Sequence, residues 1–253
     1  MENILKSKDL KVALYFSAIG LAAGIFVGIY QIPMLSEEIK RQIIGQYGTT
    51  NAIIAISAVQ STVYAFLSAF FGLKIARKVN LKLNFKFDKS ALLLATLIGF
   101  VVAIIITGSD KFIFAVYLPP QITAYVFSPV YLMTGILYGG IIEELMLRLL
   151  VMSLLVLVIR KLFTRSKDSL NIPGWIYITA IVLSAMMFAA GHLPNTAQIL
   201  GLSAPILIRC FILNGIGGIG FGYLYWKKGL AYSMYAHGAA HFFMQVILIP
   251  ILF

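Results

Sequence analysis

Long apolar stretches recur along this chain at a length that few folds accommodate. Seven of them reach roughly 20 residues or more, enough for an α-helix to cross a hydrocarbon core of about 30 Å. Lipid offers the backbone no hydrogen-bond partners, so such segments have to be helical. The sequence therefore predicts an all-α polytopic membrane protein with about seven transmembrane helices. Their approximate bounds are 12–34, 51–74, 91–108, 129–158, 174–192, 201–225 and 229–252.

Composition supports a chain that is embedded throughout. Of 253 residues, 60% are hydrophobic and only 11% are charged, which leaves too little polar surface to cover a soluble globule. We expect a single membrane domain over residues 1–253. The first apolar run is longer than a signal-peptide core and lacks a clear cleavage site, so we expect a retained helix. A single cysteine, Cys210, excludes an internal disulfide and a cysteine-rich metal cluster.

The basic residues predict topology. The formal net charge is +11, but the Lys and Arg residues lie in short loops between apolar runs. This pattern predicts contact with membrane lipids and argues against nucleic acid. With a cytoplasmic N-terminus, fifteen of the twenty basic residues lie inside and three lie outside. We therefore expect cytoplasmic loops at 75–90 and 160–172 and an external C-terminus.

Two connecting segments carry further predictions. Residues 35–50 mix charged side chains with isoleucines, which is typical of an interfacial stretch, here on the outer side. Residues 109–128 contain two prolines and are expected to form a loop or a short re-entrant piece. No internal repeat of the kind found in secondary transporters is present in the sequence.

Three charged residues lie in the middle of the fourth span, where each costs several kcal/mol unless it has a partner or faces water. Glu144 and Arg148 are four residues apart and share one helix face, with the acid in the favoured N-terminal position. Glu143 points about 100° away. This geometry predicts that Arg148 holds Glu144 while Glu143 is free for proton transfer. The alternative is a purely structural ion-pair cluster.

The three histidines of the chain lie in the last apolar regions. His237 and His241 project from one helix face, and small residues between them allow another backbone to approach. A pair of this kind can bind a metal or oppose an oxyanion. A lone buried histidine such as His192 is more often a core residue, but three beside a buried acidic pair favour a site. Counting residues from the basic loops places these groups mid-membrane or in its outer half, with the side of access left open.

The three motifs together resemble a known family. Glu143 to Arg148 fits E-E-x-x-x-R, Phe188 to His192 fits F-x-x-x-H, and His237 opens an H-x-x-x-polar motif. In this order and spacing they resemble the CPBP intramembrane protease family, also called Abi, which includes CAAX prenyl endopeptidases and bacteriocin-processing or immunity proteins. The resemblance covers about residues 129–253 and implies a catalytic core in the last four helices. The expected location is a bacterial cell membrane.

The resemblance implies a glutamate-dependent peptidase in which Glu143 and His192 activate a water. It also implies that His237 and the polar residue after it stabilise the oxyanion, although the family usually has Asn or Asp where this chain has His241. The residue types agree, because amide hydrolysis needs a base, a proton donor and oxyanion donors. No serine or cysteine stands in a comparable arrangement, which favours water as the nucleophile.

Cofactor use stays open at this point. Glu143, His192, His237 and His241 could together ligate zinc, which would make the protein a metalloendopeptidase. An H-E-x-x-H motif is absent from the sequence, and a glutamate beside a histidine can activate water without a metal. We favour metal-independent catalysis. Arg209 could snorkel outward, pair with a carbonyl or bind a substrate carboxylate.

Two classes of function fit these residues. The first is an intramembrane endopeptidase that hydrolyses a peptide bond in a membrane-associated or lipidated peptide or protein. The second is a non-enzymatic membrane protein, such as a bacteriocin immunity factor or a transporter, that uses the buried charges structurally or as a proton relay. A protease requires Glu143 for turnover, whereas a binding protein should tolerate its isosteric loss.

Overall fold

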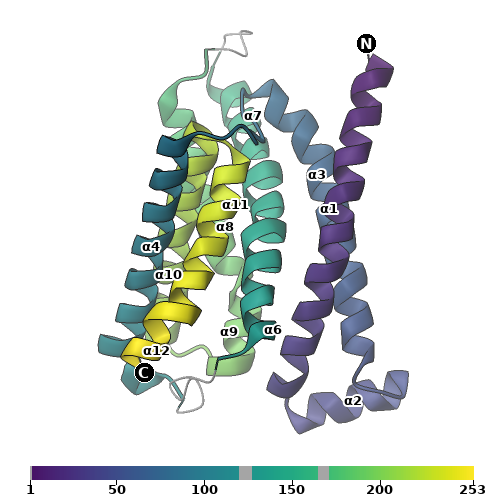
Figure 1. The fold of residues 1–253 in the computed structure, drawn as a ribbon, viewed down its shortest axis with the longest axis vertical. Coiled ribbons are helices and arrows are strands. Elements are labelled where there is room, and N and C mark those ends of the chain that lie inside the picture. The colour runs from purple at the N-terminus through teal and green to yellow at the C-terminus, as the bar shows by residue number, and fades with distance from the viewer. Residues whose placement is uncertain (1, 120–126, 165–170) are drawn as a thin grey trace.

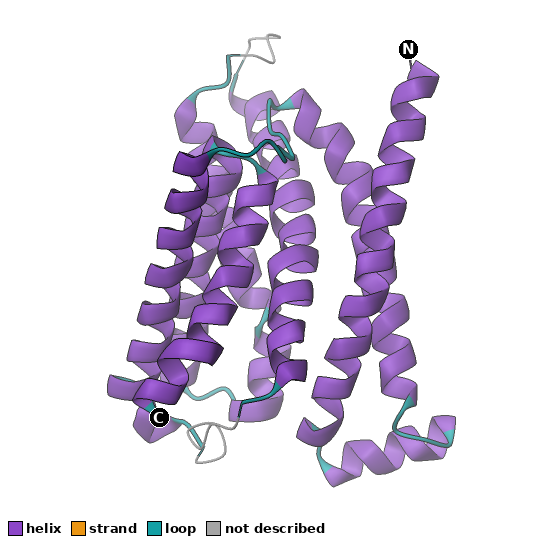
Figure 2. Cartoon of the chain, viewed as in Figure 1, coloured by secondary structure: helices purple, strands orange, loops and turns teal. Residues whose placement is uncertain are grey.

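The computed structural model describes residues 2–119, 127–164 and 171–253, with side chains from residue 8 onward. Helices joined by short loops make up this part of the chain, and it contains no strand (Figure 2). The all-α polytopic fold predicted from the sequence is thus confirmed. In chain order the elements are α1 (Glu2–Gln31), the 3-10 helix η1 (Ile32–Met34), α2 (Glu37–Tyr47), α3 (Ala52–Lys78), α4 (Lys89–Phe112), the 3-10 helix η2 (Ala115–Tyr117), α6 (Pro129–Met133), the π-helices η3 (Thr134–Glu143) and η4 (Leu145–Met152), α7 (Ser153–Phe163), α8 (Gly174–Gly191), α9 (Leu193–Leu200), α10 (Ala204–Lys227), α11 (Leu230–Phe242), the π-helix η5 (Phe243–Leu248) and α12 (Ile249–Leu252).

Six helical stretches in the described residues are long and apolar enough to cross a membrane. The remaining predicted span, 129–158, is a continuous helical stretch from Pro129 to Phe163 that passes from α6 through η3 and η4 into α7. Its middle adopts π-type hydrogen bonding, which often marks functional segments. Several helices extend beyond the predicted ends. Helix α4 begins at Lys89 because the Asp88 side chain accepts hydrogen bonds from the first backbone N–H groups.

The connections gather at two opposite ends of the molecule (Figure 1). One end, which we call the basic end, holds the start of α1, the loop between α3 and α4, the end of α7 and the turn between α10 and α11. The other, which we call the distal end, holds α2, α9 and the C-terminus. The two predicted cytoplasmic loops thus begin at the same end. The orientation of these ends relative to the membrane stays a prediction.

Helices α1 and α3 form a close pair along one side of the bundle (Figure 1). Gly20 and Gly24 of α1 face small residues of α3, and Gly28 lies against the backbone of Ile54, a spacing of small residues by which membrane helices approach closely. A Cβ atom at Gly24 would lie 2.3 Å from the carbonyl oxygen of Ser57. Backbone contact therefore fixes this pair, and the pair in turn packs on η3 and η4.

The two connecting segments differ in outcome. Helix α2 lies across the distal end, begins at an N-cap formed by Ser36 and has no buried residue, as an interfacial stretch would (Figure 1). Within 109–128, α4 continues to Phe112 and the short helix η2 follows. Residues 120–126 of that segment lie outside the described residues. The structure therefore tests the prediction of a loop or re-entrant piece only for the described residues on either side of 120–126.

Candidate active site

Glu144 lies at the centre of a buried polar cluster and is fully inaccessible to solvent. His237 on α11 donates from Nδ1 to its Oε1 at 2.9 Å. Ser233, one turn earlier on α11, donates from Oγ to its Oε2 at 2.5 Å. The Nε atom of Arg148 lies 3.4 Å from the same oxygen. The pairing of Glu144 with Arg148 expected from their spacing is present, and it is joined by two groups from α11.

Arg148 is also completely buried. Its guanidinium carbon lies 5.2 Å from the ring centroid of Phe188, and its three nitrogens lack hydrogen-bond partners. Among the described residues the only ion pair of Arg148 is with Glu144. A buried cation with one counter-ion depends strongly on that counter-ion, so the two residues act electrostatically as a unit.

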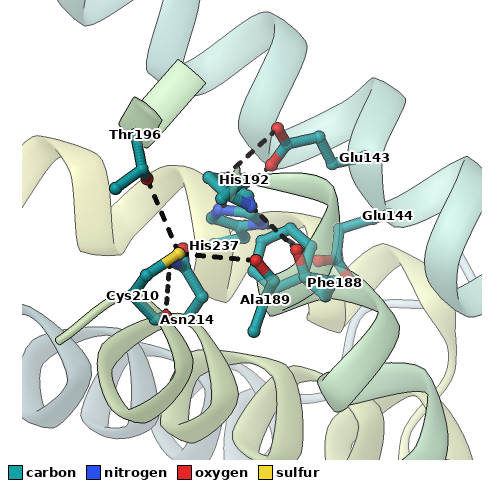
Figure 3. A network of polar contacts seen from close by, with 9 residues as sticks. All are labelled: Glu143, Glu144, Phe188, Ala189, His192, Thr196, Cys210, Asn214 and His237. Atoms are coloured by element: carbon teal, nitrogen blue, oxygen red, sulfur yellow. Dashed lines mark hydrogen bonds and ion pairs between the residues drawn. The ribbon is translucent and has the colours of Figure 1, made fainter. Parts of the chain in front are cut away.

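Glu143 is oriented differently and keeps 18% of its side chain exposed. Its Oε1 lies 3.9 Å from Nε2 of His192, and its Oε2 lies 3.9 Å from Nε2 of His237 (Figure 3). Both separations exceed a direct hydrogen bond, and polar groups at such distances are commonly bridged by water. The structure thus brings the free carboxylate and two imidazoles from three separate helices to one point.

His192 occupies the junction between α8 and α9, two residues before Pro194 in the first turn of α9. Its Nδ1 lies 2.9 Å from the carbonyl oxygen of Phe188. A carbonyl can only accept, so Nδ1 carries the hydrogen and, in the neutral ring, Nε2 presents its lone pair toward Glu143. The Phe188 ring meets His192 edge-on at 4.6 Å and His237 edge-on at 5.9 Å. Phe188 therefore positions both imidazoles.

His237 is held on both faces. Phe221 of α10 stacks on it at 4.5 Å and His241 stacks on it at 5.2 Å. The His241 ring lies against two glycines of η3, where Cβ atoms at Gly135 and Gly139 would come within 2.6 Å and 2.8 Å of it. Its Nδ1 is buried without a hydrogen-bond partner. His241 thus supports His237, and in the described residues no ion pair links it to Glu143.

A cavity of about 320 Å³ adjoins Glu143. The expectation that the last four spans alone form the site is incomplete, because α1 and α3 supply one wall of this cavity. A sequence pattern could not show this, since these helices carry no motif. The lining residues are Val27, Tyr30, Gln31, Ser57, Gln60, Ser61, Thr134, Tyr138, Glu143, Met146, Leu147, Met187, Phe188, Gly191, His192 and Asn195.

Other polar groups near the site differ from expectation. Arg209 forms a bidentate ion pair with Asp110, with both contacts at 2.6 Å, and this pair joins the end of α4 to the start of α10. Asp110 is thus the partner of Arg209, rather than a carbonyl or open water.

Ser233 was not predicted as a site residue, although its position four residues before His237 would have indicated a shared helix face. Cys210 is buried beside Thr196 and Asn214, where Asn214 donates to the Cys210 carbonyl (Figure 3).

The positions of the four candidate metal ligands can be compared with the geometry of a zinc site. The candidate ligands Glu143, His192, His237 and His241 all lie in described residues, and in that part of the chain no group of three or more His, Cys, Asp or Glu side chains is arranged to hold a metal ion. Ligands on a tetrahedral zinc with bonds of about 2.0 Å lie about 3.3 Å apart, closer than the carboxylate and imidazole atoms here. Metal-independent catalysis, which the sequence favoured, stays a prediction.

Comparison with known proteins identifies one family. Residues 125–243 match the model of the Rce1-like type II CAAX prenyl endopeptidases. The match contains all three motifs and the buried cluster, and it confirms the resemblance to CAAX-type intramembrane proteases seen in the sequence. It does not include α1 or α3. No curated protein and no solved structure matches the chain.

Proposed function

Residues 125–243 carry the Rce1-like CAAX protease signature, and from that premise we propose that the chain is a glutamate-dependent endopeptidase. Its substrate is a peptide bond in a membrane-associated or lipidated peptide or protein. One observation carries the proposal: the cavity-facing carboxylate of Glu143 lies between the Nε2 atoms of His192 and His237, at 3.9 Å from each.

The nucleophile is a water held beside Glu143. Such a water donates one hydrogen to the Glu143 carboxylate and the other to Nε2 of His192, whose lone pair faces the same space. Its oxygen attacks the carbonyl carbon as Glu143 takes the proton, and the carbonyl π electrons move to oxygen. Collapse of the tetrahedral intermediate breaks the C–N bond, and the proton on Glu143 passes to the leaving amine.

The oxyanion is stabilised from the side of α11. Since Nδ1 of His237 donates to Glu144, its Nε2 can donate as well only when the ring is doubly protonated. The buried Glu144 carboxylate supplies the counter-ion that such an imidazolium requires. His237 then directs an N–H toward the developing oxyanion, with His241 stacked behind it. In this scheme Glu144 and Arg148 position His237 and take no proton from the substrate.

We further propose that hydrolysis needs no metal. The two Nε2 atoms are each 3.9 Å from a carboxylate oxygen, a distance suited to a bridging water. Activity should persist in protein stripped of metal by a chelator. Stoichiometric zinc in the purified protein, with activity lost to a chelator and restored by zinc, would replace this scheme with a metallopeptidase.

The test compares the termini of membrane peptides from cells that express the wild-type chain or Glu143→Gln. New termini should depend on Glu143, because removal of a general base costs about 10²–10⁴-fold in rate. The matched control is Glu38→Gln, an exposed carboxylate on α2 outside the cavity. Equal peptide patterns for the wild type and Glu143→Gln would favour the binding or transport class instead.

A further inference from the structure

The cavity beside Glu143 is lined by residues from the half of the bundle that lies toward the distal end. Tyr30 and Gln31 are the last residues of α1 and of its turn into η1, and Ser57 and Gln60 lie early in α3. On the opposite wall, the lining residues come from residues 134–147 of the helix that begins at Pro129, from the end of α8 and from α9. All of these segments run toward the distal end (Figure 1). The cavity therefore extends from Glu143 toward α9 and the ends of α1 and α3 that lie at the distal end.

The distribution of Lys and Arg residues predicts which end of the molecule faces the cytoplasm. The basic end holds the loops that carry most Lys and Arg residues of the described chain, including Lys82 and Lys228, whereas the elements at the distal end carry Lys40, Arg41, Lys111 and Arg209, the last of them paired with Asp110. Short cytoplasmic loops are enriched in Lys and Arg, so this asymmetry predicts that the distal end lies outside. A cavity that extends toward the distal end then belongs to the outer half of the membrane.

The wall formed by α3 and α1 is polar but uncharged. Ser57, Gln60 and Ser61 of α3 and Gln31 of α1 line it, and the Oγ of Ser61 is buried without a hydrogen-bond partner. Neutral donors and acceptors of this kind suit the N–H and C=O groups of an extended peptide. Arg148 is buried behind the site and Arg209 is bound to Asp110, so neither is placed to receive a terminal carboxylate.

From these observations we infer that the peptide substrate reaches Glu143 from the external side, through the cavity between the α1–α3 pair and α8. The substrate class is an internal, uncharged segment of a membrane-anchored polypeptide exposed at the outer face, and it lies along Ser57 and Gln60. This inference rests on the proposed peptidase function for the nature of the ligand, but the direction of access is measurable without activity.

The experiment uses cysteine labelling of the full-length chain in sealed vesicles of both orientations. Cys210, the only native cysteine, is first replaced by alanine. Gln60→Cys and Asn195→Cys place thiols in the cavity, and Val59→Cys places a matched thiol one residue from Gln60 on the lipid-facing side of α3, where Val59 is 62% exposed and outside the cavity lining. The probe is a charged, membrane-impermeant methanethiosulfonate, which reacts with thiols in water.

In right-side-out vesicles, Gln60→Cys and Asn195→Cys should be labelled and Val59→Cys should not. In inside-out vesicles all three should stay unlabelled until detergent is added, whereas Lys82→Cys should react at once. Reaction of Gln60→Cys from the cytoplasmic side only, or from neither side, would overturn the inference. Where a cleaved peptide is available, modification of Gln60→Cys should raise KM more than it lowers kcat. External labelling in a chain without any hydrolysis would leave the access route standing and remove the proposed function.

Discussion

Replacement of Glu144 by glutamine should destabilise the fold far more than the same change at Glu143. Glu144 is fully buried, accepts from His237 at 2.9 Å and from Ser233 at 2.5 Å, and lies 3.4 Å from Arg148. Glutamine can keep an acceptor for His237 but leaves the Arg148 cation without a counter-ion. Removal of one partner from a buried pair costs about 3–5 kcal/mol in free energy of unfolding.

Glu143 offers the matched comparison on the same helix. Its carboxylate is partly exposed and its nearest ionisable partners are 3.9 Å away, so Glu143→Gln should cost less than about 1 kcal/mol. The measurement is equilibrium unfolding of both purified variants in one mixed-micelle system. A similar loss of stability for the two variants would refute the division between a structural and a reactive carboxylate.

A second substitution separates charge from packing. In the double variant Glu144→Gln with Arg148→Met, the orphaned cation is removed and an apolar side chain fills much of its volume. Replacement of a buried ion pair by apolar groups is often close to neutral, so the double variant should recover most of the lost stability. Additive losses from the two single changes would show that the ion pair is not the source of the effect.

Three further outcomes are expected. Gly24→Val should prevent α1 from packing on α3 and lower the thermal unfolding temperature, because its Cβ would meet the Ser57 carbonyl at 2.3 Å. The control is Gly45→Val, because the space around a Cβ at Gly45 is open. Equal unfolding temperatures for the two variants would contradict this reasoning. Arg209→Met should destabilise the protein by leaving Asp110 unpaired, and Arg209→Met with Asp110→Asn should be more stable than Arg209→Met alone in the same unfolding assay. Gly135→Ala should displace the His241 ring and cost about 1–3 kcal/mol of unfolding free energy, whereas wild-type stability would show that the ring moves freely.

The helices, and the spacings that bring the candidate site residues onto common helix faces, could be predicted from the sequence because their causes are local. A span must be an uninterrupted apolar helix in lipid, which defines its position to within a few residues. The four-residue spacings of Glu144 with Arg148 and of His237 with His241 place each pair on one helix face before any packing is known. The motifs that contain Glu143 and His192 likewise indicated a peptidase family, which the match over 125–243 bears out.

Tertiary structure alone decided what surrounds these residues. The distance from Glu143 to His192 and His237, the ion pair of Arg209 with Asp110 and the polar wall contributed by α1 and α3 join segments that are far apart in the chain. Such contacts depend on how each helix is rotated and tilted against its neighbours. Close backbone approach at glycines such as Gly24 and burial of the Glu144–Arg148 ion pair constrain these rotations and tilts. The periodicity of a single span does not encode them.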